Sequence, residues 1–160
     1  MTDKEKLTVV VFSDDLDRAL AAFGIAVTAA SMGMDVTMAF TFWGLNILRK
    51  SKNGFKGKGL LRRIVNLVNR GGPDRLGLSK HHMLGLGPWA MKRLMKDSKM
   101  PSIDEFITMA KDMGVRLVIC TGTWGPFGFD KDSFRTEVDA IGGTAYWLED
   151  AAKSKLAFFI

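Results

Sequence analysis

The first apolar run of the chain is Leu7-Thr8-Val9-Val10-Val11-Phe12, an unbroken series rich in β-branched residues. Such a run is typical of a parallel strand that is buried on both faces. Ser13-Asp14-Asp15 then supplies helix-capping residues, and Leu16 begins an apolar pattern that predicts a helix ending near Gly33. A second run at residues 36–42 predicts another strand. The order strand, helix, strand predicts two parallel strands joined by a right-handed crossover.

The rest of the chain continues this alternation. Residues 115–119 form a third β-rich run that ends at Cys120, and residues 156–160 predict a last buried strand. Helices are expected at residues 43–49, 60–68, 88–96, 101–114, 130–142 and 144–153. Together these elements predict one domain, residues 1–160, built as a three-layer α/β/α sandwich of flavodoxin or Rossmann type with a mainly parallel sheet of about five strands. A basic, Gly- and Lys-rich excursion is expected at about residues 50–72.

Positive charge is concentrated in the middle of the chain. The net charge is +6, and fourteen Lys or Arg residues lie between residues 49 and 99 beside only two acids, Asp74 and Asp97. This imbalance favours contact with anions, an acidic partner protein or a membrane surface. A solvated helix face with a charged loop explains the same residues. Nucleic acid is the less favoured partner, because no aromatic or groove-reading motif accompanies the basic residues.

Cysteine usage and the N-terminal residues bear on the compartment. Cys120 is the single cysteine, so no intrachain disulfide can form, and a lone thiol is typical of a reducing compartment. Residues 1–6 show no apolar segment of a secretory signal. The uncharged stretch at residues 19–34 has 16 residues, which is short of the roughly 20 that span a bilayer. We therefore expect a cytoplasmic protein without a transmembrane helix.

Two motifs of other chemistries are incomplete. Gly85-Leu86-Gly87-Pro88-Trp89-Ala90 matches the pattern G-x-G-x-x-A, but no strand precedes it and Pro88 removes one amide from a phosphate cradle. Its glycines instead predict a tight turn into the next helix. His81 and His82 lack the second cysteine or the carboxylates that would complete a metal site with Cys120. We expect no metal and no bound cofactor.

Cys120 stands where the third predicted strand ends, at the sheet edge where open α/β sheets bind ligands. Backbone amides after it, a helix N-terminus and the basic segment all favour a thiolate. A free cysteine is also often an inert core residue, so both interpretations stay open. Trp43 and Trp124 each follow a strand end and either shield a pocket from water or fill the core. The candidate pocket residues are Ser13, Asp14, Phe42, Trp43, Gly44, Thr121, Gly122, Thr123 and Trp124.

A resemblance to the DsrE-like sulfur-relay family, including its "peroxiredoxin-like" branch, runs through residues 12–19, 32–38, 40–45, 83–87, 114–120 and 158–160. The string Phe40-Thr41-Phe42-Trp43-Gly44-Leu45 is the most distinctive of these segments. The resemblance implies a small α/β domain that forms homo-oligomers with active cysteines near subunit interfaces. Cys120 occupies the position of the sulfur-carrying cysteine. The chain departs from the family pattern directly after it, where Thr121-Gly122-Thr123-Trp124-Gly125-Pro126 replaces a stretch similar to Met-Ser-Met.

What the resemblance implies for function is a sulfurtransferase or sulfur carrier. Cys120 would accept sulfur from a donor protein as a covalent persulfide and pass it to an acceptor protein, with no other cofactor. Amides of residues 121–123 would stabilise the sulfur anion. The alternative is a non-catalytic docking module that binds an acidic protein or a membrane surface through the basic segment. In that case Cys120 is only structural.

Overall fold

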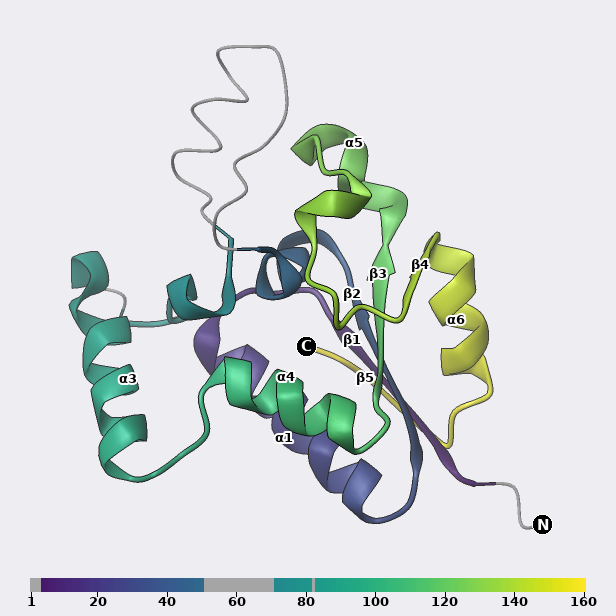
Figure 1. Cartoon of the computed structure of the whole chain (residues 1–160), viewed down its shortest axis with the longest axis horizontal. Helices are drawn as coiled ribbons and strands as arrows, with labels where there is room; N and C mark the ends of the chain where they lie inside the picture. The colour runs from purple at the N-terminus through teal and green to yellow at the C-terminus, as the bar shows by residue number, and fades with distance from the viewer. Residues whose placement is uncertain (1–3, 51–70, 82) are drawn as a thin grey trace.

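The computed structural model describes residues 4–50, 71–81 and 83–160, and Figure 1 shows a twisted sheet with helices packed on it. Five parallel strands form the sheet in the order β4-β3-β2-β1-β5. They are β1 (Lys6–Val11), β2 (Asp35–Phe40), β3 (Arg116–Cys120), β4 (Ala140–Gly142) and β5 (Leu156–Phe159). The predicted α/β sandwich with a parallel sheet of about five strands is confirmed.

The helices divide between the two faces of the sheet because of the strand order. From β1 to β4 the chain moves along the sheet in one direction, through α1 (Leu16–Ser31) and α4 (Ile103–Asp112). The connection from β4 to β5 runs the opposite way, through α6 (Thr144–Ala152). Right-handed crossovers that run in opposite directions place their helices on opposite faces. α1 and α4 therefore cover one face together, and α6 packs on the other against β1 to β4 (Figure 1).

Two further helices lie outside these layers. α3 (Leu86–Asp97) stands at one side of the molecule, away from the sheet, and α5 (Trp124–Phe127) is a single turn above the end of β3 (Figure 1). A 3-10 helix, Phe42–Leu48, follows β2 where the sequence predicts a short helix. None of the helices in the described part of the chain is long and apolar enough to cross a membrane.

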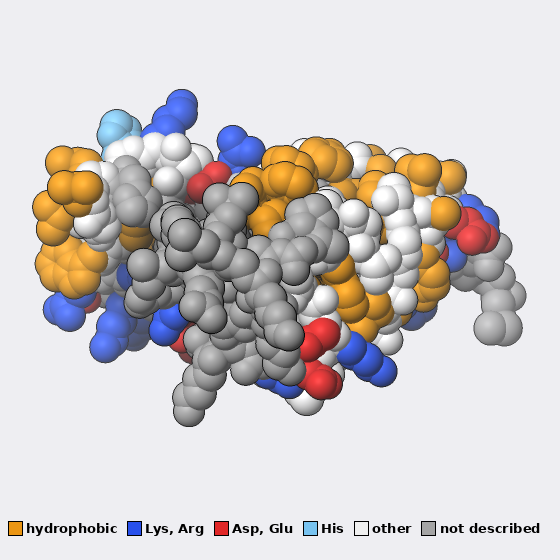
Figure 2. Space-filling view, turned by 90° about the horizontal axis from the view of Figure 1, so that it is seen from above, with side chains coloured by type: hydrophobic (Ala, Val, Ile, Leu, Met, Phe, Trp, Pro, Cys, Tyr) orange, Lys and Arg blue, Asp and Glu red, His pale blue; other side chains and the backbone are white. Residues whose placement is uncertain are grey.

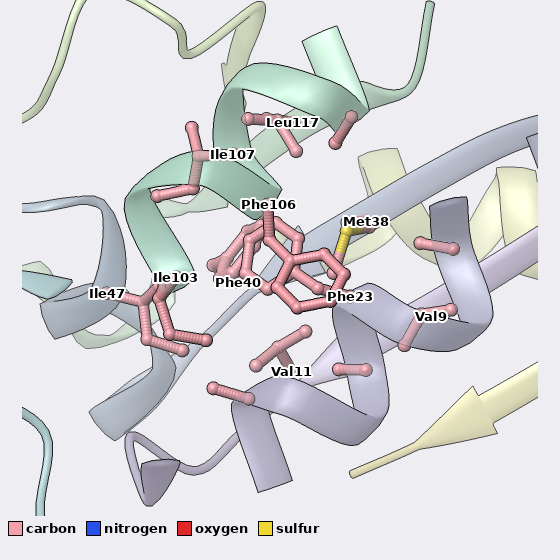
Figure 3. Close-up of a cluster of buried hydrophobic side chains, with 14 of the residues drawn as sticks. Val9, Val11, Phe23, Met38, Phe40, Ile47, Ile103, Phe106, Ile107 and Leu117 are labelled. Atoms are coloured by element: carbon pink, nitrogen blue, oxygen red, sulfur yellow. The ribbon is translucent and has the colours of Figure 1, made fainter. Parts of the chain in front are cut away.

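The core lies between the sheet and the layer of α1 and α4. Figure 3 shows Phe23 of α1, Phe40 of β2 and Phe106 of α4 meeting there. The Phe23 ring lies 6.0 Å from that of Phe40 and 6.3 Å from that of Phe106. Met38 and Leu117, from β2 and β3, are fully buried beside them. Each such side chain contributes about 1.5–3 kcal/mol by its burial, so this cluster fixes the inner strands whose carboxyl ends form the site.

The helix predicted at residues 130–142 is wrong. Its predicted cap does form, since Asp130 and Ser133 make a capping box. The helix nevertheless ends after one 3-10 turn, and the N–H of Arg135 donates to the carbonyl of Leu48 at 3.0 Å. These tertiary partners outweigh the local helix signal. The chain then runs into β4, a strand that the sequence analysis did not predict.

The strand predicted at residues 156–160 forms, but its predicted burial is wrong. β5 is an edge strand that pairs with β1. Its residues are exposed along their whole length, with Leu156 at 47% and Phe159 at 67%. The cause is the position of α6, which packs on β1 to β4. An apolar run in the sequence is therefore not sufficient evidence that the strand is buried.

Two other predictions fall mainly or wholly outside the described residues. They are the basic excursion at about residues 50–72 and the helix at residues 60–68. The helices predicted at residues 88–96, 101–114 and 144–153 correspond to α3, α4 and α6.

Candidate functional site

Cys120 is the last residue of β3, and a 3-10 turn, Thr121–Thr123, and then α5 follow it. Its backbone lies beside Gly142 of β4 in the sheet. The thiol therefore lies at the carboxyl edge of the sheet, where the strand pattern places it. The residue is only 1% exposed, so the thiol lies just beneath the surface rather than on it.

Four neutral polar groups influence the Cys120 sulfur, and one of them, the Thr144 hydroxyl, lies within hydrogen-bond distance of it. They are the indole of Trp147, the N–H of Gly122 and the hydroxyls of Thr144 and Thr41. The Thr144 hydroxyl oxygen lies 3.7 Å from Sγ. Burial raises the pKa of the Cys120 thiol, but these donors lower it by more, so the pKa lies below its ordinary value. Hydrogen bonds to the charged form thus favour a thiolate in spite of its burial.

Trp147 supplies the least satisfied of these donors. Its Nε1 is buried and has no hydrogen-bond partner in the described part of the chain. Leaving a buried donor unpaired costs about 1–3 kcal/mol, and a sulfur anion at Cys120 would offer the acceptor that this N–H lacks. Thr144, three residues earlier, lies on the same face of α6. As the first residue of α6, it also brings the partial positive charge of the helix N-terminus to the sulfur.

A thin layer separates the sulfur from solvent. Gly122 and Thr144 are both exposed, although Cys120 beneath them is not. A methyl group at residue 122 would lie 3.5 Å from the sulfur and 3.6 Å from the Thr144 hydroxyl oxygen. Both distances are ordinary van der Waals contacts. The missing side chain of Gly122 therefore leaves room for about one more heavy atom beside the sulfur.

Ser13 and Asp14, predicted pocket residues, organise the end of β1. The Ser13 hydroxyl donates to Asp15 Oδ2 at 2.7 Å. Asp14 Oδ2 accepts from Asn46 Nδ2 at 2.8 Å. Burial raises the pKa of the Asp14 carboxyl, and the Asn46 hydrogen bond offsets only part of that effect. These contacts brace the start of α1 and the 3-10 helix after β2, and neither side chain is among the sulfur's hydrogen-bonding neighbours in the described residues.

Gly44 joins the turn after β2 to β1. Its N–H donates to the carbonyl of Phe12 at 2.8 Å, and the N–H of Thr41 donates to the carbonyl of Val11 at 3.0 Å. A Cβ at residue 44 would lie only 2.1 Å from the Val11 carbonyl oxygen. Glycine is therefore required for this close approach of two backbones, and the approach positions Thr41 beside the sulfur.

The two tryptophans that the sequence analysis proposed as shields belong to one aromatic cluster. The Trp43 ring lies 5.1 Å from that of Phe127, and the Trp124 ring stacks on Phe134 at 5.4 Å. Phe129 lies between them, 5.4 Å from Phe127 and 5.6 Å from Phe134. Phe42 adds an edge contact to Trp43 at 5.0 Å and another to Phe127 at 5.5 Å. The indole that lowers the pKa of the Cys120 thiol is a different one, Trp147.

The remaining loop residues hold the turn after β3. The Thr121 hydroxyl donates to the carbonyl of Gly142 at 3.4 Å. Thr123 Oγ1 and Trp124 Nε1 are buried and have no hydrogen-bond partner among the described residues. Of this predicted stretch, Gly122 is the residue whose N–H meets the sulfur.

Sequence reasoning missed Thr41, Thr144 and Trp147. The spacing of three residues between Thr144 and Trp147 would have placed both on one face of the predicted helix at residues 144–153. Their role was not predicted because the sequence analysis expected a helix at residues 130–142 and therefore left out β4. The pairing of β4 with β3 is what brings the start of α6 to Cys120.

The other motifs lie away from this site. Within the described ranges, no group of three or more His, Cys, Asp or Glu side chains could hold a metal ion. His81 is exposed in the turn before α3, and His82 lies outside the described residues. Gly85 has a φ of +100°, and a Cβ on Gly87 would lie 1.9 Å from the carbonyl oxygen of His81. These glycines therefore form a tight turn into α3, as the sequence predicts.

Replacing Trp147 with phenylalanine tests the indole donor. The change keeps most of the aromatic bulk and removes the N–H that favours the thiolate. The pKa of the Cys120 thiol should therefore rise, and the alkylation rate should increase over a higher pH range than in the wild type. The loss of one hydrogen bond to an anion, about 1.5 kcal/mol or more, slows alkylation near neutral pH by about tenfold. The measurement is the rate of iodoacetamide labelling against pH. Trp43→Phe is the matched control, and an equal shift in both variants would contradict this role for Trp147.

Comparison with known proteins places the chain in a family. The DsrE/DsrF/DrsH-like family model matches residues 3–159. A Bacillus subtilis (strain 168) protein, "Uncharacterized protein YrkE", is 38% identical over 161 residues, which cover 100% of both chains. The "Sulfur carrier protein DsrE2" of Allochromatium vinosum is 29% identical over 167 residues, covering 99% of each.

A solved structure shares the fold. The ychN protein from E. coli matches with a TM-score of 0.58 over 98% of this chain and 99% of that one, at 8% sequence identity. At that identity the likeness concerns the fold alone. The family model spans every residue from β1 to β5. The chain belongs to the DsrE/DsrF/DrsH-like family.

Proposed function

We propose that the protein is a sulfur carrier that holds sulfur as a persulfide on Cys120. The observation that carries this proposal is the place of the Cys120 sulfur at the end of β3, 3.7 Å from the Thr144 hydroxyl oxygen and beside the space left by Gly122. Burial raises the pKa of the thiol, but neighbouring hydrogen-bond donors lower it by more, so it lies below its ordinary value. A structural cysteine in a core has no need of such donors. Family membership and the likeness to a protein named as a sulfur carrier support the same conclusion.

The transfer requires no oxidant or reductant. The Cys120 thiolate attacks the outer sulfur of a donor persulfide, R–S–SH. A new S–S bond forms, the bond between the donor's two sulfurs breaks, and the donor leaves as a thiolate, R–S⁻. Cys120 is then Cys–S–SH. An acceptor thiolate attacks the outer sulfur in the same way, and Cys120 is released as a thiolate.

The partners follow from the cysteine count. Because the chain contains one cysteine, neither the donor nor the acceptor thiol can come from the same chain. We infer that both belong to other proteins that dock at the carboxyl edge of the sheet. Cys120 is only 1% exposed, and Gly122 and Thr144 are its exposed neighbours, so we infer that transfer includes a movement of the turn Thr121–Thr123 that exposes the sulfur.

Mass spectrometry after incubation with a persulfide donor tests the proposal. We expect a gain of one sulfur atom per chain that is removed by a thiol reductant. Peptide mapping should place the added sulfur on the peptide that contains Cys120. The second half of the experiment offers the loaded protein to a thiol acceptor protein and follows the loss of that mass. A protein that never gains the mass, or that gains it on another residue, contradicts the proposal.

Gly122→Ala tests the space beside the sulfur. The added methyl would lie 3.5 Å from Sγ, in the region that the outer sulfur of the persulfide must occupy or cross. We expect loading to slow by about tenfold or more, since misplacing a reacting group by about 1 Å has effects of that size. Gly143→Ala is the matched control, because a methyl there meets nothing within 4 Å. Equal loading rates in the two variants would show that the turn does not govern access.

A further inference from the structure

An apolar patch is exposed at the end of the molecule formed by α3 and the turn before it. Figure 2 shows hydrophobic side chains gathered there, with Lys and Arg side chains beside them. Leu84 is 103% exposed, Trp89 68%, Met83 66%, Leu86 64% and Leu94 61%. Contiguous exposed apolar side chains of this kind mark an interaction surface in a soluble domain. We call residues 83–97 the α3 arm.

The α3 arm is apolar on two opposite faces. Pro88 and Met95 are buried and face the body of the protein. Leu86, Ala90 and Leu94 are exposed, and their spacing of four residues places them together on the outer face. An inner apolar stripe is sufficient to hold a helix on a domain. The outer stripe therefore serves no packing within the described part of the chain.

Basic residues surround the outer stripe. In residues 71–100 there are six Lys or Arg residues and two acids. One of the acids, Asp97, already pairs with Arg93 at 3.4 Å. Lys80, Lys96 and Lys99 are exposed. A helix that combines Leu and Trp side chains with surrounding Lys and Arg is suited to lie in the interface of a membrane, with the apolar side chains inserted and the cations at the headgroups.

The turn before α3 holds two of these apolar side chains outward. Met83 has a φ of +40° and Leu84 a φ of +55°. This left-handed conformation costs non-glycine residues roughly 1 kcal/mol or more. The surrounding structure thus keeps Met83 and Leu84 in solvent in an unfavourable backbone conformation. This arrangement is expected of a surface that binds an apolar partner.

We propose that the α3 arm docks the protein peripherally onto a membrane surface that contains anionic phospholipids. The charge of the arm favours this occupant over a second copy of the chain. Two α3 arms packed face to face about a two-fold axis would bring their Lys and Arg residues together and repel each other. The docking surface does not include Cys120, so this proposal does not depend on the sulfur-carrier proposal.

Vesicle binding of the chain of residues 1–160 tests the inference. The probes are vesicles of phosphatidylcholine alone and vesicles that also contain phosphatidylglycerol, each at low and high salt. We expect sedimentation with the phosphatidylglycerol vesicles, weakened by salt because the charge attraction is screened. The fluorescence of Trp89 should shift to shorter wavelength on binding, and Trp89→Phe should lose that part of the shift.

Substitutions on the outer face separate the contributions. The double variant Leu86→Ser and Leu94→Ser should weaken vesicle binding by at least about tenfold. Lys96→Gln and Lys99→Gln should each weaken it by about fivefold. The matched control is Met32→Ser with Leu148→Ser, which removes exposed apolar side chains, 76% and 54% exposed, from other elements. Circular dichroism checks that all variants keep the wild-type helix content.

Three results would overturn the inference. The first is no binding to phosphatidylglycerol vesicles by the wild-type protein. The second is equal vesicle binding by the α3 variant and its control. The third is found by light scattering without lipid: if the Leu86→Ser and Leu94→Ser variant dissociates an oligomer that the wild type forms, the arm is a contact between copies of the chain.

Discussion

Cys120→Ser will abolish sulfur loading and leave the fold intact. A serine hydroxyl cannot form a persulfide, and this is the single cysteine of the chain, so the mass gain with a persulfide donor should vanish. The serine hydroxyl has two acceptor lone pairs and can accept from two of the polar groups around the sulfur, such as Thr144 and Trp147. We therefore expect the free energy of unfolding to change by no more than about 1 kcal/mol. Urea unfolding of both proteins measures that change.

Cys120→Ala completes this test. Trp147 Nε1 has no hydrogen-bond partner beside the thiol in the described residues, and alanine, unlike serine or a sulfur anion, offers it no acceptor. Such an unpaired donor costs about 1–3 kcal/mol, and alanine should therefore be less stable than serine. A cysteine that served only apolar packing would give the opposite order, because a buried hydroxyl without partners is the costlier change. The order of the two stabilities decides between the two interpretations of Cys120.

Gly44→Ala will strongly destabilise the protein. The new Cβ would lie 2.1 Å from the carbonyl oxygen and 2.8 Å from the carbonyl carbon of Val11. Both atoms belong to the backbone of β1, which lies between two strands and cannot move aside cheaply. We expect a loss of about 3 kcal/mol or more. For a chain of this size that loss corresponds to a fall in Tm of about 6–12 °C, measured by circular dichroism.

Gly24→Ala is the control for this substitution. Gly24 lies within α1, and a Cβ there meets nothing within 4 Å. Alanine in a helix interior is more favourable than glycine by about 0.5–1 kcal/mol, so Tm should rise slightly. The Gly44→Ala protein that remains folded should also react more slowly with iodoacetamide at Cys120, because the displaced turn after β2 contains Thr41. Similar stabilities for the two alanine variants would contradict the close approach of residue 44 to β1.

The parts of the fold that the sequence predicts well are those whose signal is local. The apolar runs of β1, β2 and β3 are buried on both faces, and their composition alone distinguishes them. The helices that begin with capping residues and end at glycine, such as α4 with its Ser102 and Glu105 capping box, are equally well marked. The position of Cys120 at a strand end follows from these elements.

What the sequence does not predict depends on distant partners. β4 has three half-buried residues and forms because it pairs with β3, so no local pattern reveals it. The exposure of β5 depends on the position of α6. The influence of Trp147 on the Cys120 thiol depends on that same packing, so no local pattern marks it, whereas Trp43 and Trp124 stand out because each follows a strand end.

The neutrality of the polar groups around Cys120 affects how the thiol responds to salt. Dipoles fixed in the protein interior are hardly screened by dissolved ions, unlike pairs of surface charges. The readiness of the thiol to react should therefore stay constant when the salt concentration around the protein changes. Encounters with charged partners will vary with those conditions, so chemistry and recognition can be adjusted separately by substitutions at different positions.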